Sequence, residues 1–241
     1  MLIYGINPVT EALRAGRVTA LRVGRRADER IRAVLRLAEQ RGVPVQQVDD
    51  AALDRAAPQG VHQGVIGDLR AGAAYSVADL VREASAPALL VVLDGIEDPH
   101  NVGAILRTAD AAGVHGVVRQ TRRAAPLGDA VTKASAGAVA HVKIAAVVNI
   151  ARAIEELKAA GVWTVGLASQ APVRYDQIDL TVPVALVLGA EGTGLRRLVR
   201  ERCDLLMAIP MEGHVESLNV SVAAGVALFE ALRQRRRSGA R

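Results

Sequence analysis

Residues 88–95 read ALLVVLDG, an almost unbroken apolar run that ends in an acidic residue and a glycine. Strands buried on both faces of a parallel sheet have this character. A second run, VPVALVLG at residues 182–189, shares it. Predicted helices alternate with predicted strands around both runs, which is the pattern of a parallel sheet covered by helices. We therefore predict an α/β fold with a parallel sheet at its core.

On either side of these two runs, shorter patterns of apolar and polar residues predict the remaining strands and helices of the region after residue 87. Further strands are expected at 116–119, 162–168 and 205–210, and helices at 101–112, 129–136, 150–160, 195–202 and 218–236. In the last helix, Leu218, Val222, Phe229 and Leu232 are expected to face inward.

The first 70 residues predict a smaller α/β unit. Strands are expected at 19–24, 43–48 and 62–69, and helices at 28–41 and 50–57. Residues 71–86 contain Ala, Gly and Ser with weak periodicity, which indicates a linker that could hold a short helix. The predicted organisation is a domain at 1–70, a linker at 71–86 and a second domain at 87–241.

The composition, 51% hydrophobic and 23% charged, is typical of a folded globular protein. No apolar run approaches the roughly 18 residues that a membrane span needs, and the N-terminus lacks the basic-then-apolar order of a signal peptide. Cys203 is the only cysteine, so an internal disulfide is excluded and a cysteine-based metal site is not expected. We expect a cytoplasmic protein without a membrane partner or a bound metal.

The chain carries a net charge of +5, and nearly all of its 30 basic residues are arginines. A genome-wide codon bias could enrich arginine, but phosphate binding would use the same side chain because its planar group holds two oxygens at once. The arginines form three clusters: Arg14, Arg17, Arg22, Arg25, Arg26, Arg30, Arg32 and Arg36; Arg119, Arg122 and Arg123; and Arg233, Arg235, Arg236, Arg237 and Arg241. Together these clusters favour an anionic polymer as partner.

Three segments could carry chemistry, and the first is LDGIEDPHNVGAILRTADAAGV at residues 93–114. A buried strand ends at Asp94, and Pro99 indicates that a loop follows. Asn101 is expected to cap the next helix. Arg107 lies off the apolar stripe of that helix and can point toward the crevice at the strand ends. An ordinary cap and a surface arginine would explain these two residues equally well.

The second segment, VALVLGAEGTGLRRLV at 184–199, is a buried strand followed by a glycine-rich loop. Its spacing, G-x-x-G-x-G, is not the dinucleotide fingerprint, and it lacks the lysine of a phosphate-binding P-loop. This spacing argues against a dehydrogenase. Glu191 would repel phosphate but tolerate a cationic ligand. A helix start with a capping acid is the alternative interpretation.

The third segment, IPMEGHVESLNVSVAAGVALFEAL at 209–232, joins a strand to the last helix. Ser217 is expected to be the helix cap, and Asn219 falls in the first turn, where a side chain can reach a ligand. Gly225 costs a helix about 1 kcal/mol relative to alanine, which suggests that another element packs closely there. Caps and core residues would explain each position taken alone.

Taken together, the order and spacing of the three segments resemble the SpoU-type RNA 2′-O-ribose methyltransferases of the SPOUT superfamily. The family motifs match Asn101 with Arg107, Gly189–Gly194 with Glu191, and Ser217 with Leu218 and Asn219. The resemblance covers about 88–237. The N-terminal part resembles the substrate-binding domain of members that methylate a guanosine of bacterial 23S rRNA.

The resemblance implies a catalytic domain with a C-terminal trefoil knot, a homodimer formed through that domain, and S-adenosylmethionine as cofactor. The residues that it implies for cofactor binding are Gly189, Gly192, Ile209, Met211 and Leu218. Those that it implies for catalysis are Asn101, Arg107, Glu191, Ser217 and Asn219. The arginine-rich N-terminal domain is expected to bind RNA.

The implied reaction is the attack of a ribose 2′-oxygen on the methyl group of the cofactor, with removal of the hydroxyl proton. The resemblance assigns that proton to Arg107. Because a guanidinium is essentially always protonated, Arg107 could instead bind a phosphate and stabilise the developing alkoxide. A tRNA methyltransferase and a non-catalytic RNA-binding module of ribosome assembly are the alternative functions.

Overall fold

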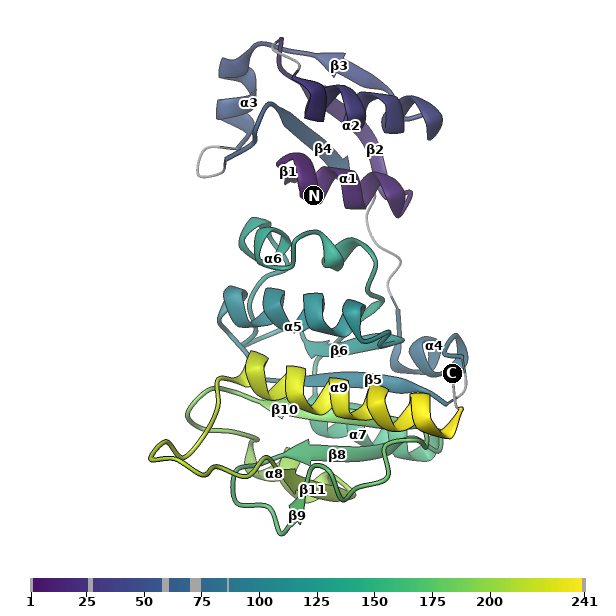
Figure 1. Cartoon of the computed structure of the whole chain (residues 1–241), viewed down its shortest axis with the longest axis vertical. Coiled ribbons are helices and arrows are strands. Elements are labelled where there is room, and N and C mark those ends of the chain that lie inside the picture. Colours follow the sequence, from purple (N-terminus) through teal and green to yellow (C-terminus); the bar gives the residue numbers. More distant parts are fainter. Residues whose placement is uncertain (1, 26–27, 58–60, 70–74, 86, 240–241) are drawn as a thin grey trace. The chain divides into compact units, whose positions relative to one another are not determined.

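The computed structural model describes residues 2–25, 28–57, 61–69, 75–85 and 87–239 (Figure 1). They form two compact units. Unit 1 comprises Met1–Ala73 and Pro126–His141, and unit 2 comprises Ala74–Ala125 and Val142–Arg241. Arg26, Arg241 and part of the predicted linker lie outside the described residues. No helix of the described segments is both long and apolar enough to cross a membrane.

Unit 1 is built on a four-stranded mixed sheet in the order β1-β4-β2-β3. Its strands are β1 (Leu2–Tyr4), β2 (Val18–Val23), β3 (Val45–Gln47) and β4 (Val65–Leu69), and its first helices are α1 (Ile6–Arg14), α2 (Glu29–Gln40) and α3 (Asp50–Ala56). Helices α1 and α2 share one apolar cluster with the sheet, in which Leu13, Leu21 and Val34 are buried. Helix α3 contributes Leu53 to a second cluster around Ile66. Strand β1 and helix α1 had no counterpart among the predicted elements.

Unit 1 also contains α6 (Asp129–Ala134) and the 3-10 turn η1 (Ala138–Ala140), which follow β6 in the chain. The Arg17 guanidinium donates to the carbonyl oxygens of Val139 (3.0 Å) and Ala140 (3.1 Å). His141 Nε2 lies 3.3 Å from a carboxylate oxygen of Glu11. These contacts hold the segment against α1, so Arg17, a member of the first arginine cluster, has a structural role.

Unit 2 contains a parallel sheet of seven strands in the order β7-β6-β5-β10-β8-β11-β9, which confirms the predicted core. The strands are β5 (Leu89–Asp94), β6 (Gly116–Gln120), β7 (Ile144–Val147), β8 (Trp163–Leu167), β9 (Val173–Arg174), β10 (Val184–Gly189) and β11 (Leu205–Ala208). The two apolar runs are the neighbouring strands β5 and β10, with Gly189 paired to Asp94. Strands β7 and β9 were not predicted.

Helices cover both faces of this sheet (Figure 1). They are α4 (Val77–Arg82), α5 (Pro99–Ala111), α7 (Ile150–Ala159), α8 (Arg197–Arg202) and α9 (Val220–Ser238). Helices α4, α7 and α8 share one apolar cluster with the sheet, in which Leu80, Ile154 and Val199 are buried. Helices α5 and α9 pack against each other, and α9 crosses β10.

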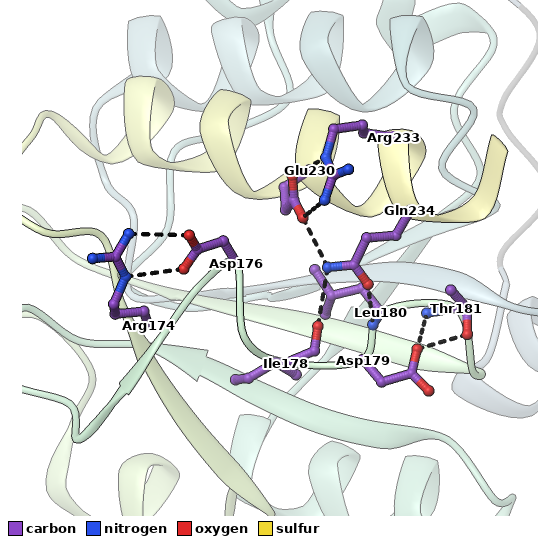
Figure 2. A network of polar contacts seen from close by, with 9 residues as sticks. All are labelled: Arg174, Asp176, Ile178, Asp179, Leu180, Thr181, Glu230, Arg233 and Gln234. Carbon is purple, nitrogen blue, oxygen red and sulfur yellow. Dashed lines mark hydrogen bonds and ion pairs between the residues drawn. The ribbon is translucent and has the colours of Figure 1, made fainter. Parts of the chain in front are cut away.

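The C-terminal half of α9 is fixed to the segment between β9 and β10 (Figure 2). The side-chain amide of Gln234 donates to the carbonyl oxygen of Ile178 (3.0 Å), and its oxygen accepts from the Leu180 N–H (2.9 Å). Arg235 is buried, and its guanidinium donates to the carbonyl oxygens of Leu180 and Val182 and of two residues that precede β5, Pro87 and Ala88.

Two predicted helix caps are wrong. Helix α5 begins at Pro99 with Asp98 as its cap, and Asn101 lies inside the first turn. Proline suits the first helical position because its missing N–H has no partner there and its φ is already helical. Helix α9 begins at Val220, and its cap is Asn219, not Ser217. The Asn219 side chain accepts the Ser221 N–H (2.9 Å).

The inward face predicted for the last helix is also wrong in part. Val222 and Phe229 are 52% and 51% exposed, whereas the small residues Ala224, Ala227 and Ala231 are buried. Small side chains let α9 lie close to its neighbours, and Leu228 is buried beside them, so the buried face is offset from the predicted one. The element that packs near Gly225 is α5, but a Cβ there would lie 3.9 Å from Thr108, an ordinary contact distance.

Candidate active site

The carboxyl ends of β8, β10 and β11 and the start of α9 surround a cavity of about 240 Å³. Apolar residues, among them Leu167, Leu188 and Met207, line it together with two acidic residues, Glu191 and Glu216. Every residue predicted to bind the cofactor lines this cavity, as do two of those predicted for catalysis: Gly189, Gly192, Ile209, Met211 and Leu218, with Glu191 and Ser217.

The glycine-rich loop after β10 has a shape that requires its glycines. Gly192 and Gly194 have φ values of +77° and +66°, a region that glycine enters without steric cost. The loop folds back on itself, since the N–H of Gly194 donates to the carbonyl of Ala190 (2.8 Å) and the reverse bond spans 3.1 Å. A Cβ on Gly189 would lie 2.2 Å from the carbonyl carbon of Gly194. The loop is therefore narrow, and its backbone forms part of the cavity wall.

One side chain from each of the three predicted segments meets in a small polar cluster. Asn101 Nδ2 donates to Glu191 Oε2 (3.1 Å), and Asn219 Nδ2 donates to Glu191 Oε1 (2.7 Å). Asn219 Nδ2 also donates to Asn101 Oδ1 (3.0 Å). Asn219 Oδ1 accepts hydrogen bonds from the N–H and the hydroxyl of Ser221, in the first turn of α9. The Nδ2 group of Asn219 is therefore the side of the amide that faces the Glu191 carboxylate.

Arg107 does not join this cluster. It lies six residues after Asn101 on α5, which is about 9 Å along the helix axis. Its side chain is exposed and makes no hydrogen bond or ion pair with any residue that the structure describes. The guanidinium is thus free to bind an anionic group from outside the chain.

An ion pair between a buried carboxylate and a half-exposed arginine, which the motifs did not predict, fixes the far end of the glycine-rich loop. Asp94 is fully buried at the end of β5, and it accepts the backbone N–H (2.9 Å) and the Nε (2.6 Å) of Arg196. Arg196 Nη2 in turn donates to Gln120 Oε1 at the end of β6 (2.7 Å). The signal was present in the sequence, because an acid ended one buried strand and an arginine followed the loop of the other.

The remaining candidate for nucleophilic or metal chemistry is not suited to it. Burial raises the pKa of the Cys203 thiol to about 12, so the sulfur stays protonated at neutral pH. Within the described parts of the chain, no group of three or more His, Cys, Asp or Glu side chains could hold a metal ion. The cavity and its polar cluster are therefore the candidate active site.

Comparison with known proteins agrees with this fold and shows the family. The model of the SpoU rRNA Methylase family matches residues 88–229, and a model described as RNA 2′-O ribose methyltransferase substrate binding matches residues 2–72. The chain belongs to the SpoU rRNA methylase family, as its motifs predicted.

Among its relatives is the 23S rRNA (guanosine-2′-O-)-methyltransferase RlmB of Pseudomonas syringae pv. tomato. The two are 45% identical over 239 residues, which cover 97% of this chain and 95% of the relative. RlmB of Nitrosomonas europaea is also 45% identical, over 236 residues that cover 96% of this chain and 91% of the relative.

A solved structure of similar fold is the SpoU methyltransferase AviRb of Streptomyces viridochromogenes in complex with the cofactor AdoMet. Its TM-score is 0.83 at 25% identity, and the match covers 98% of this chain and 91% of that chain. An AdoMet-bound rRNA methyltransferase of Sinorhizobium meliloti has a TM-score of 0.79 at 29% identity and covers 98% and 87%. Both relatives bind the cofactor that the motifs predicted for this chain.

Proposed function

We propose that this protein transfers a methyl group from S-adenosylmethionine to the ribose 2′-hydroxyl of a guanosine in 23S rRNA. The observation that carries the proposal is the cluster of Asn101, Glu191 and Asn219 at the edge of the cavity, since it joins the three family motifs in one place. The names of the similar RlmB proteins support the choice of 23S rRNA and guanosine.

The cavity fits the cofactor by its chemistry. Its apolar walls suit an adenosine, and the carboxylates of Glu191 and Glu216 suit a ligand with a sulfonium and an ammonium group. When bound, the cofactor supplies a methyl group that is activated by the positive charge on sulfur. Gly189, Gly192, Ile209, Met211 and Leu218 would hold it, the last four from the loops around the cavity.

The other residues prepare the acceptor. Asn101, Glu191 and Asn219 brace three loops against one another, and with Ser217 they position the ribose beside the cavity. Arg107 supplies a permanent positive charge that binds a phosphate and stabilises the charge developing on the ribose oxygen. Its exposure and its lack of a carboxylate partner among the described residues support this electrostatic role.

The exposed face of α9 supports a homodimer formed through the catalytic domain. Val222 and Phe229 are separated by seven residues, so they lie on one side of the helix, and both are about half exposed. Phe229 is the only phenylalanine in the chain. A second copy of the chain would cover this apolar face.

Two further features belong to the proposal. We propose that the C-terminal part forms a trefoil knot, which is supported by the binding of the segment between β9 and β10 to α9, some 50 residues later in the chain. A crystal structure in which α9 can be withdrawn without passing through that segment would contradict it. An enzyme that modifies bacterial rRNA would act in the cytoplasm, where ribosomes are assembled.

The function is tested with purified protein, labelled S-adenosylmethionine and either 23S rRNA or tRNA. We expect labelled 2′-O-methylguanosine in 23S rRNA, and Arg107→Ala should reduce the rate by at least 100-fold. Label in tRNA alone would favour a tRNA methyltransferase. Failure to bind the cofactor would favour a non-catalytic RNA-binding module.

The same question is answered in cells by mapping 2′-O-methyl sites in rRNA and tRNA with and without the gene. A single guanosine of 23S rRNA should lose its methyl group. An unchanged map would contradict the proposal.

A further inference from the structure

We propose that the loop at residues 121–125, which follows β6, is a clamp for phosphates of the RNA backbone. The clamp consists of the guanidinium groups of Arg122 and Arg123. This inference rests on the proposed function and adds the place where unit 2 holds its RNA substrate.

The arginines of the second cluster have separate roles. Burial lowers the pKa of the Arg119 guanidinium, which donates to the carbonyl oxygen of Ala125 and so closes the loop. Arg122 and Arg123 are exposed, and no side-chain hydrogen bond or ion pair links either to another part of the described chain. Two adjacent cations therefore remain without a counter-charge at the tip of the loop.

Some other exposed arginines of unit 2 are neutralised locally, although Arg107, Arg200, Arg236 and Arg237 have no such partner among the described residues. Arg152 pairs with Glu156 (3.2 Å) on α7, and Arg197 pairs with Glu201 (3.5 Å) on α8. The glutamate in each pair neutralises the arginine and so weakens its attraction for an anionic ligand. Arg152 and Arg197 thus show that exposure alone does not leave an arginine of this unit unpaired.

The loop is held in one conformation by the buried side chain of Gln120. Its amide donates to the carbonyl oxygens of Arg122 and Arg123, the latter at 3.0 Å. Arg123 has a φ of +52°, which is uncommon for a long side chain. Such a conformation persists only where its surroundings enforce it, and it is found most often at functional sites.

The same contacts connect the loop to the candidate active site. The side-chain oxygen of Gln120 accepts from Arg196, which follows the glycine-rich loop and whose guanidinium also binds Asp94 at the end of β5. The N–H of Ala125 donates to the carbonyl of Ile96 (3.2 Å), in the segment that leads to Asn101. The loop that carries the two cations is therefore linked by hydrogen bonds both to Arg196, which follows the glycine-rich loop, and to the segment before Asn101.

This chemistry recognises phosphate and not base identity. A guanidinium can donate two parallel hydrogen bonds to one phosphate, and phosphate contacts orient a nucleic acid without reading its sequence. We expect the clamp to hold the strand on one side of the target nucleotide and to leave the choice of base to other residues.

The test measures the affinity of the whole protein for a 23S rRNA fragment that the wild type methylates, at several salt concentrations. Each phosphate contact contributes about 0.7 to the slope of log affinity against log salt for a single strand. The double variant Arg122→Ala, Arg123→Ala should lose about 1.4 from this slope and bind roughly 25-fold more weakly at 0.1 M salt.

The matched control is the double variant Arg152→Ala, Arg197→Ala, which removes the same charge from side chains that are 82% and 88% exposed. Its slope should stay at the wild-type value. An equal loss in both double variants, or no loss in the first, would overturn the proposal.

A second pair, Arg122→Gln with Arg123→Gln, keeps side chains of similar length and must give the same loss. If the alanine double variant no longer binds S-adenosylmethionine, the glutamine double variant is the one that tests the clamp. Wild-type protein that neither binds the cofactor nor methylates the RNA would count against the proposed function, whereas normal wild-type activity with unaffected variants would count only against the clamp.

Discussion

At the scale of single residues, Gly189 shows how closely the cavity is built. A Cβ at this position would meet only main-chain atoms, at 2.2 to 2.5 Å from Gly194 and Leu195. Main chain cannot rotate away as a side chain can. Gly189→Ala should therefore displace the whole loop, abolish binding of S-adenosylmethionine and lower the free energy of unfolding by about 3 kcal/mol. Calorimetric titration and thermal unfolding measure the two effects.

Gly213→Ala is the matched control, because nothing lies within 4 Å of a Cβ built at Gly213. It should bind the cofactor as the wild type does. Equal behaviour of the two alanine variants would show that the Gly189 contact does not shape the cavity.

Residue patterns were enough to select the cavity residues but not their partners. The family motifs led to Gly189, Met211 and Leu218, all of which line the cavity. They did not lead to the pair of Asp94 and Arg196: the acid and the arginine were visible at the ends of their segments, but local spacing does not show which residues 102 positions apart meet. The roles of Asn101, Arg107, Glu191, Ser217 and Asn219 remain predictions.

At the scale of elements, α9 is held by a buried cation. Arg235→Ala would remove the donor from carbonyl oxygens of four residues in two other segments. Buried acceptors without a donor are costly, so we expect the free energy of unfolding to fall by about 3 kcal/mol. Chemical denaturation checks this value. Arg236→Ala, on the exposed side of the same helix, should change it by less than about 0.5 kcal/mol.

The same helix should confer a dependence of stability on pH. Hydrogen bonds from Arg233, with a further one from Gln234, lower the pKa of Glu230 (Figure 2). A carboxyl whose pKa is lower in the folded protein stabilises the fold above its unfolded pKa, about 4.3, and this contribution is lost as pH falls through the folded pKa.

Denaturation of the wild type and Glu230→Gln between pH 7 and pH 3 tests this. The difference in unfolding free energy should be constant near neutral pH and shrink on acidification. A difference that grows as the pH falls would contradict the assignment.

Helices and strands were predicted well where apolar residues are dense. They were predicted poorly where a cap sets the start of a helix or small residues form its buried face. Strands β5 and β10 were recognised because both faces are apolar. The start of α5 was misplaced because a polar residue in the first turn resembles a cap. The buried face of α9 was misjudged because alanines and two charged residues, Glu230 and Arg235, make up most of it, so its apolar pattern is weak.

At the scale of the whole molecule, the proposed homodimer depends on the exposed face of α9. Phe229→Asp would place a negative charge in the apolar face that each copy is proposed to bury against the other. The dissociation constant of the dimer should rise by roughly 100-fold or more. Sedimentation measures it, with Val148→Asp as control, since Val148 is 80% exposed and lies away from α9. A wild-type protein that sediments as a monomer would contradict the dimer.

The large-scale plan was only partly accessible from the sequence. Alternation of strands and helices predicted the parallel sheet, but it carries no information on how the chain is threaded, so the prediction of a knot came from resemblance and stays a prediction. The predicted domains, 1–70 and 87–241, follow the order of the chain. The structure instead groups Pro126–His141 with the first unit, because Arg17 and Glu11 hold that segment.

This grouping means that the polypeptide passes between the two halves three times, after residues 73, 125 and 141. A truncated protein that began at residue 74 would keep η1 and Gly137 but lose the helix on which they rest. Neither unit is thus formed by one continuous segment of the chain. Exchanging the first unit for that of another enzyme would require transplanting the internal segment Pro126–His141 together with the N-terminal piece.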